Sequence, residues 1–300
     1  MPLLNEADNV QFGTGQVDAI YMGSNLVWVP VIRATGGDVA EVNIDGTIYK
    51  VHTFTSDGEF VVNGVGLDPT VEYVIVGGGG AGGRSDDTEP GGGGGGGGYR
   101  SSVVGELSGR NTAAEPKFTV SKTVYPVVVG GGGAASTSTE QPGGNSSVFG
   151  IVSLGGGRGG RGRVTNGANG GPGGSGGGAG SDEFSTRSGG AGTAGQGFNG
   201  GSSPNANLER SGGGGGAAGA GQNGVESGAL GGPGLTTNIT GSPMTLSAGG
   251  RGRSRTSNAG GPGGANTGNG GRGGRSGPTR VAGDPGGSGI VIIRYPIGTA

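Results

Sequence analysis

VEYVIVGGGGAGG, residues 71–83, joins a short apolar strand directly to a run of glycines. Residues 286–296, GGSGIVIIRYP, show the reverse order, with glycines leading into an apolar strand. Runs of β-branched and aromatic residues such as these are typical of β-strands. Between the two segments the chain is too rich in glycine for ordinary helices and strands, because glycine weakens both. To infer the function, we must therefore first ask which structure a segment so rich in glycine can adopt.

The composition leaves two possibilities for this region: a disordered chain, or an ordered structure in which nearly all backbone groups are hydrogen-bonded. Of 300 residues, 85 are Gly and 15 are Pro. Ordering a backbone costs about 1–2 kcal/mol per residue, so an ordered form needs nearly all of its backbone hydrogen bonds. Low-complexity composition favours disorder. However, the apolar residues cluster in strand-like runs and the formal net charge is only −2, so we expect order.

Several kinds of site have no candidate residues. The chain has no cysteine, which leaves no disulfide or thiolate metal site, and its single histidine, His52, cannot form a histidine cluster. We expect His52 to be a half-exposed strand residue. The first residues, MPLLNEADNV, lack signal-peptide features, and no apolar run reaches the roughly 18 residues that span a bilayer. We therefore expect no cofactor, no metal and no membrane insertion in a protein made in the cytoplasm.

Residues 1–30 are expected to form a separate β unit. The segment VQFGTGQVDAIYMGSNLVW alternates apolar and polar residues, with turns near residues 13–15 and 23–25, which predicts a short β-hairpin or meander. A unit of this size is too small to be stable alone, so we expect it to dock on its own domain, other copies or a larger assembly. Trp28 is either a core residue of this unit or a partner contact.

The order of apolar and glycine blocks after residue 70 indicates chain direction. Residues 71–83, 118–133 and 151–160 pass from apolar residues into glycine, whereas residues 91–104, 143–149 and 286–295 pass from glycine into apolar residues. If these apolar ends lie side by side, the two groups run antiparallel. They then form one β-rich base with a single core, and every glycine part projects from the same side.

A glycine rod with polyproline II geometry suits the projecting part. That geometry has three residues per turn, a rise of about 3.1 Å, and outward-pointing N–H and C=O groups. Without Cβ atoms, rods can approach closely and bond on several sides, each bond contributing a net ~0.5–1.5 kcal/mol. A collagen triple helix is not expected, because the Gly-X-Y register is not kept.

We therefore expect an all-β protein with little or no α-helix. The N-terminal β-hairpin unit spans residues 1–30, and the β-strand base spans residues 31–76, with a hairpin turn at residues 56–58. A bundle of antiparallel polyglycine II helices spans residues 77–300 and closes with a strand at 289–296. The far loops are expected at 84–90, 134–142 and 158–169; for 202–211 and 251–259 the direction is left open.

In chain order, the motifs GTIYKVHTFTSDGEFVV, VEYVIVGGGGAGG, GGGGGGGGYRSS, YPVVVGGGG, GGNSSVFG and GGSGIVIIRYP resemble the glycine-rich domain of bacteriophage tail-fibre, tail-tip and receptor-binding proteins over about residues 36–300. The segment QVDAIYMGSNLVWVP resembles virion-attachment segments of phage tail proteins. The resemblance implies a non-enzymatic virion tail protein whose far loops bind the host surface. Implied partners are other phage tail proteins and a bacterial cell-surface glycan or outer-surface protein. Phage fibres are often trimeric, so a homotrimer is one option.

Under this resemblance, the candidate receptor contacts lie in the polar inserts: Asp86, Asp87, Thr137, Arg161, Arg163, Leu208, Arg210, Arg253 and Arg255. Candidate virion-attachment residues are Tyr21 and Trp28. The arginines could bind anionic surface glycans through bidentate hydrogen bonds. As simple loop residues, they would instead be solvated charges.

Two motifs suggest other ligands. Gly77, Gly79 and Gly82 have the spacing of a dinucleotide-binding fingerprint, but the following RSDDTEPGGGGGGGG cannot form the helix that this fingerprint needs. The arginine–glycine boxes at 157–163, 250–255 and 271–275 resemble RNA-binding tails. The net negative charge and the acidic inserts argue against nucleic acid.

Four functions remain as alternatives. The leading hypothesis is a receptor-binding tail protein. The runner-up is a purely structural virion component, in which the inserts are only turns. An ice-binding bundle would need a flat face of regularly spaced small residues, whereas these inserts are charged and irregular. A disordered RNA-binding tail would show no cooperative thermal unfolding.

Overall fold

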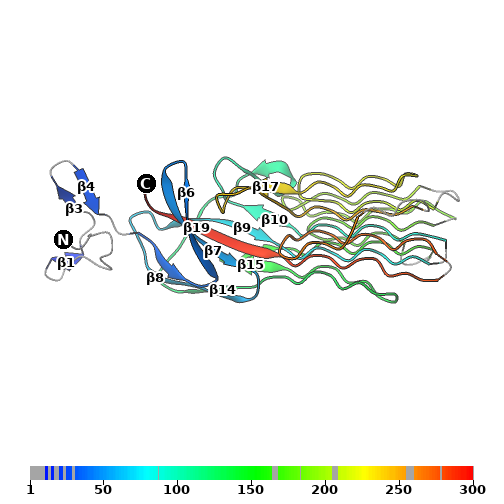
Figure 1. Ribbon diagram of the computed structural model, residues 1–300, viewed down its shortest axis with the longest axis horizontal. Coiled ribbons are helices and arrows are strands. Elements are labelled where there is room, and N and C mark those ends of the chain that lie inside the picture. The colour runs from blue at the N-terminus through cyan, green and yellow to red at the C-terminus, as the bar shows by residue number, and fades with distance from the viewer. Residues whose placement is uncertain are drawn as a thin grey trace.

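The computed structural model describes residues 31–86, 88–163, 168–182, 184–204, 209–254, 260–277 and 279–299, and the backbone of four short strands before residue 31. Within these residues the regular structure consists of β-strands and one 3-10 turn, η2 (Gly109–Asn111), so the expected all-β class is confirmed. A β-rich base lies at one end of residues 31–299, and the glycine-rich segments extend from it as a long bundle (Figure 1).

Two antiparallel strand pairs account for the described backbone before residue 31. β1 (Gln11–Phe12) pairs with β2 (Gly15–Gln16), and β3 (Ile20–Met22) pairs with β4 (Asn25–Trp28). These pairs confirm the expected hairpins. The side chains of Tyr21 and Trp28 lie outside the described residues, so their attachment role stays a prediction.

The last strand of the chain lies inside the main sheet rather than at its edge. β19 (Ile290–Thr299) pairs antiparallel with β9 (Thr70–Val76) on one side and with β7 (Thr47–Phe54) on the other. The motifs that open and close the glycine-rich region are therefore adjacent strands. The sheet continues to β10 (Tyr99–Ser101) beside β9 and to β6 (Asp38–Ile44) beside β7, and β13 (Phe118–Thr119) also pairs with β9.

Smaller antiparallel pairs complete the base. β14 (Val124–Val127), β8 (Gly58–Gly64) and β5 (Arg33–Thr35) form a three-stranded sheet. Three further hairpins are β11 (Leu107–Ser108) with β12 (Thr112–Ala113), β15 (Ser146–Val148) with β16 (Ile151–Ser153), and β17 (Leu235–Thr237) with β18 (Met244–Leu246). The last two reverse the chain from one glycine segment into the next.

The prediction of a hairpin around residues 56–58 is wrong, because the strands before and after this turn belong to different sheets. β7 pairs with β6 and β19, whereas β8 pairs with β14 and β5. Phe54 and Phe60, one at each side of the turn, lie in the same core cluster. The chain therefore crosses from one sheet to the other here and places both rings between them, which buries more apolar area than a hairpin open to solvent.

The core consists of two clusters rather than the single one expected. On β19, Val291 and Ile293 belong to one cluster, and Ile290 and Ile292 belong to the other. Successive strand residues point to opposite faces, so the sheet is buried on both faces. This double burial explains why IVII is an uninterrupted apolar run.

His52 is fully buried, which corrects the expectation of a half-exposed residue. Its Nδ1 lies 2.7 Å from the Gly36 carbonyl oxygen, and its Nε2 lies 3.2 Å from the Tyr295 hydroxyl. A carbonyl can only accept, so Nδ1 carries the proton and Nε2 accepts from Tyr295. Burial lowers the pKa of His52, and the charge of Lys50 lowers it further, while the Gly36 hydrogen bond opposes both. His52 is therefore a neutral core residue.

The rod at residues 77–83 donates its N–H groups to three neighbouring rods in strict rotation. Each third N–H returns to the same neighbour, at N···O distances of 2.8–3.1 Å. The accepting segments are, in rotation, residues 92–98, residues 141–144 and residues 284–287. A three-residue period is the period of polyproline II geometry.

Other rods donate to the carbonyl groups of the same rod. They are residue 133, residues 156–159 and residues 271–274. The last two segments run parallel to the rod, whereas the three accepting rods run antiparallel to it. The directions match wherever the order of apolar and glycine blocks predicts one; for residues 271–274 it predicts none. The rod is thus enclosed on all sides, and its residues 77–83 are all buried. Colours from distant parts of the chain accordingly alternate across the bundle (Figure 1).

Candidate functional site

The rod ends farthest from the base gather into one surface, which we call the tip (Figure 1). Its loops are residues 84–90, 134–142, 161–168, 181–188, 203–210, 224–228, 253–260 and 275–281, of which 87, 164–167, 183, 205–208, 255–259 and 278 lie outside the described residues. All loops expected at the far end have their described residues here. The loops at 181–188, 224–228 and 275–281 were missed, because their segments lack an apolar end that would indicate direction.

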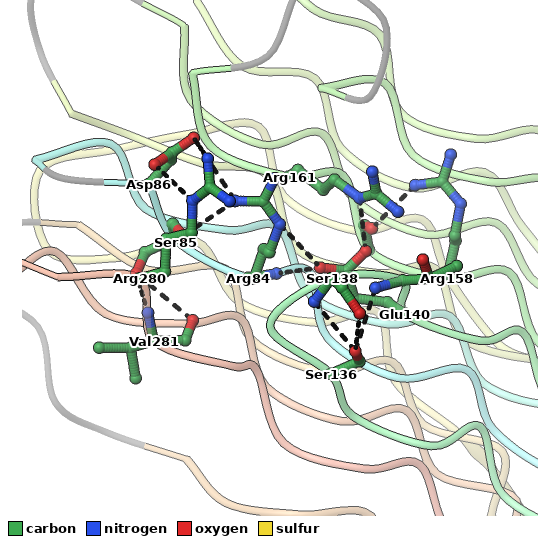
Figure 2. A network of polar contacts seen from close by, with 12 residues as sticks. Arg84, Ser85, Asp86, Ser136, Ser138, Glu140, Arg158, Arg161, Arg280 and Val281 are labelled. Atoms are coloured by element: carbon green, nitrogen blue, oxygen red, sulfur yellow. Dashed lines mark hydrogen bonds and ion pairs between the residues drawn. The ribbon is translucent and has the colours of Figure 1, made fainter.

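A buried carboxylate, Glu140, joins three tip loops. Its Oε1 accepts the backbone N–H of Arg84 at 3.1 Å, and its Oε2 accepts Nε of Arg161 at 2.7 Å. The Arg84 Nε lies 3.7 Å from Oε1, which adds an ion pair too long to be a hydrogen bond. The side chain of Glu140 is 0% exposed. Figure 2 shows Glu140 between the two arginines, which come from different rods.

Asp86 extends this network to the last tip loop. Its carboxylate lies 3.5 Å from Nη1 of Arg84 and 3.1 Å from Nε of Arg280 (Figure 2). Burial opposes ionisation of Asp86, but the hydrogen bond and charge of Arg280, with the charge of Arg84, hold its pKa below the ordinary value. The backbone N–H of Ser85 donates to the Val281 carbonyl at 2.9 Å, and the Ser85 hydroxyl accepts the N–H of Val281 at 3.0 Å. Segments almost 200 positions apart are therefore fixed to each other.

A second carboxylate, Asp182, positions an exposed aromatic residue. Its Oδ1 accepts the backbone N–H of Phe184 at 2.8 Å, and its Oδ2 accepts Nε of Arg187 at 2.7 Å. Burial opposes ionisation of Asp182, but the Phe184 and Arg187 hydrogen bonds outweigh it, so its pKa is lowered. Phe184 is 75% exposed. The contacts of Asp182 thus hold a residue that presents an apolar side chain to solvent at the tip.

The structure places the predicted contact residues in different environments. Thr137 and Arg163 are exposed on tip loops, whereas Asp86 and Arg161 are held in the network around Glu140. Two other arginines are less exposed to solvent than expected for simple loop charges. Arg210 pairs with Glu226 at 3.3 Å, and Arg253 is only 4% exposed. Asp87, Leu208 and Arg255 lie outside the described residues.

The interpretation of the arginine–glycine boxes as solvated loop charges is wrong for several of their members. Arg161 pairs with Glu140, and Arg272 donates Nε to Asp284 at 2.7 Å. Sequence reasoning also missed Arg84, Glu140, Asp182, Phe184, Arg187 and Arg280 as tip residues. The sequence did contain a signal for these residues, because arginines and carboxylates recur where the glycine runs end far from the base.

The described residues give little support for other ligands. The N–H groups of Gly77, Gly79 and Gly82, which a dinucleotide fingerprint would offer to a phosphate, are donated to other rods. Among the residues that the structure describes, no group of three or more His, Asp or Glu is placed to hold a metal ion. The same residues contain no helix with the length and hydrophobicity to cross a bilayer.

Comparison with known families gives one match. The model of a family described as a glycine-rich domain matches residues 55–296, which cover most of the chain and include the tip and the base from β8 onward. None of the curated proteins compared with this chain matched it.

Proposed function

This chain belongs to the glycine-rich domain family, and we propose that it is a bacteriophage tail-fibre or tail-tip protein that recognises a receptor on the bacterial surface. One observation carries the proposal: loops from segments spread over about residues 84–281 converge on a single surface at the end of the bundle opposite the β base. The proposed role is binding without catalysis.

Rigidity is what the bundle contributes to binding. The rods are cross-linked through their backbone amides, tip loops are joined through Glu140 and Asp86, and Asp182 binds within its own loop. Side chains that such contacts already hold in place lose little conformational entropy when they bind a partner, which favours affinity. Loops tolerate sequence change better than the elements that they connect. Such a tip therefore suits receptors that vary between hosts.

Attachment to the virion is proposed for the hairpins before residue 31. Tyr21 and Trp28 are the residue types that most often dominate interface energies. The proposed partners are other tail proteins, with a homotrimer as one assembly, and the proposed location is the tail of the virion. The receptor is proposed to be a surface glycan or an outer-surface protein.

Binding to bacterial cells tests the proposal. The full-length protein carries a fluorescent label and is added to a panel of bacterial strains, with saturable binding measured by flow cytometry. Replacing Thr137, Arg163 and Phe184 together by alanine is expected to weaken binding to a responsive strain about tenfold or more, because exposed aromatic and arginine residues dominate interfaces.

The matched control changes three exposed residues of the base, Leu67, Val104 and Lys122, to alanine. We expect this control to bind like the unmodified protein, since these residues lie at the other end of the molecule. Saturable binding to no strain, or equal binding by the tip variant, would contradict receptor recognition and favour the purely structural role.

A further inference from the structure

A cleft of about 410 Å³ opens at the tip, at the ends of three successive glycine segments. Its lining residues are Arg253, Arg272, Gly273, Arg275, Val281, Ala282 and Asp284. Three of these side chains are guanidinium ions, one is a carboxylate, and the rest are small or apolar. The walls therefore combine an excess of positive charge with enough space for a ligand group.

Backbone hydrogen bonds fix the walls of the cleft. The N–H of Gly273 donates to the Arg251 carbonyl at 3.0 Å, and the N–H of Asp284 donates to the Arg272 carbonyl at 2.7 Å. These bonds join the three segments side by side. Since the rods are ordered along their length, the cleft is preformed rather than assembled by a ligand.

Arg253 forms the deepest charged wall. It is 4% exposed, and its Nε donates to the Gly273 carbonyl at 3.0 Å, which sets the plane of the guanidinium. Burial lowers the pKa of Arg253 to about 10, and the neighbouring charges of Arg272 and Arg275 add to the effect, opposed by Asp284. The group stays protonated at neutral pH, and the local potential is positive.

One carboxylate balances only part of this charge. Asp284 accepts Nε of Arg272 at 2.7 Å. Arg275 is exposed at the cleft and forms no ion pair with any residue that the structure describes. A planar oxyanion can accept paired hydrogen bonds from a guanidinium, and such charge-assisted pairs are the strong ones.

We propose that this cleft binds an oxyanion group, a carboxylate or a phosphate, carried by an acidic glycan of the bacterial surface. The glycan part of this proposal rests on the proposed receptor-binding function. The oxyanion part rests on the cleft itself, and it can be measured without cells.

The first experiment titrates the full-length protein, labelled with ¹⁵N, with glucuronate and with inorganic phosphate at low salt. The side-chain Nε–Hε signals of Arg253, Arg272 and Arg275 are followed by NMR. We expect saturable shifts of these signals. Arg275→Gln is expected to raise the dissociation constant about tenfold, because it removes one charge-assisted pair of hydrogen bonds. The fold should not change, since Arg275 is exposed.

The control is Lys122→Gln, which removes an equal charge from an exposed residue of the base, at the other end of the bundle from the cleft. We expect its affinity for both probes to change less than about twofold, since a distant surface charge is largely screened. Absence of saturable shifts, or equal weakening by the two variants, would overturn the proposal.

A second experiment separates the cleft from the receptor-binding function. Binding to a uronic acid polymer but not to a phosphodiester-linked polymer would identify the carboxylate source, and the reverse would identify the phosphate source. If cells bind and Arg275→Gln binds them equally, the glycan proposal fails while receptor binding stands. If the small anions bind but cells do not, the oxyanion cleft stands and the receptor function fails.

Discussion

Replacing Gly80 by alanine is expected to lower the free energy of unfolding by about 3 kcal/mol, the upper end of the usual cost of overpacking. A Cβ atom at Gly80 would lie 2.2 Å from the carbonyl oxygen of Gly157 and 2.6 Å from its carbonyl carbon. Both atoms belong to the backbone of a neighbouring rod, which cannot move without losing its own hydrogen bonds. Urea unfolding followed by far-UV circular dichroism measures the loss.

Gly131→Ala is the matched control for this substitution. A Cβ atom at Gly131 would meet nothing within 4 Å, and the residue is exposed although it lies in a glycine rod. We expect this variant to be neutral or more stable by about 0.4–1 kcal/mol, because alanine has less conformational freedom than glycine in the unfolded chain. Equal stability of the two variants would contradict close packing of the rods.

Replacing Glu140 by alanine is the second substitution for which we expect a large effect, about 3 kcal/mol of stability. The change leaves the buried backbone N–H of Arg84 without its acceptor and removes the carboxylate between two arginines. Removing one partner of a buried pair costs more than the pair itself contributes, since the remaining charge is left desolvated. Urea unfolding measures the stability, and the rate of proteolysis within the tip loops measures their order.

Glu226→Ala provides the comparison at an exposed pair. Glu226 lies 3.3 Å from Arg210, but its side chain is 81% exposed. Exposed ion pairs contribute about 0–1 kcal/mol, so we expect little change in stability or proteolysis. A loss from Glu226→Ala as large as that from Glu140→Ala would show that burial of Glu140 has no special role at the tip.

The base and the direction of the first rods were predictable because local sequence encodes them. The apolar ends at residues 71–76 and 290–295 mark both the strands and the side from which each rod leaves the sheet. Residues 170–180 and 189–201 have no apolar end, so nothing local indicated their direction. Their place follows from hydrogen bonds to rods that are distant in sequence.

The tip was less predictable, because its pairs are not local. Arg84 and Glu140 are 56 residues apart, and Asp86 and Arg280 are 194 residues apart. No periodicity or spacing in the chain relates such residues. For the same reason His52 was misjudged, since Tyr295 of β19, whose hydroxyl binds the imidazole, comes from the other end of the chain.

Amide hydrogen exchange of the full-length protein tests the central claim most directly, namely that glycine rods become rigid because neighbouring rods accept nearly every N–H. For residues 77–83 and 91–98 we predict exchange slowed by about 10³-fold or more, approaching the limit that global unfolding sets. Exchange of these amides at the rate of an unfolded chain would contradict the claim, and no rigid support would then hold the tip loops together.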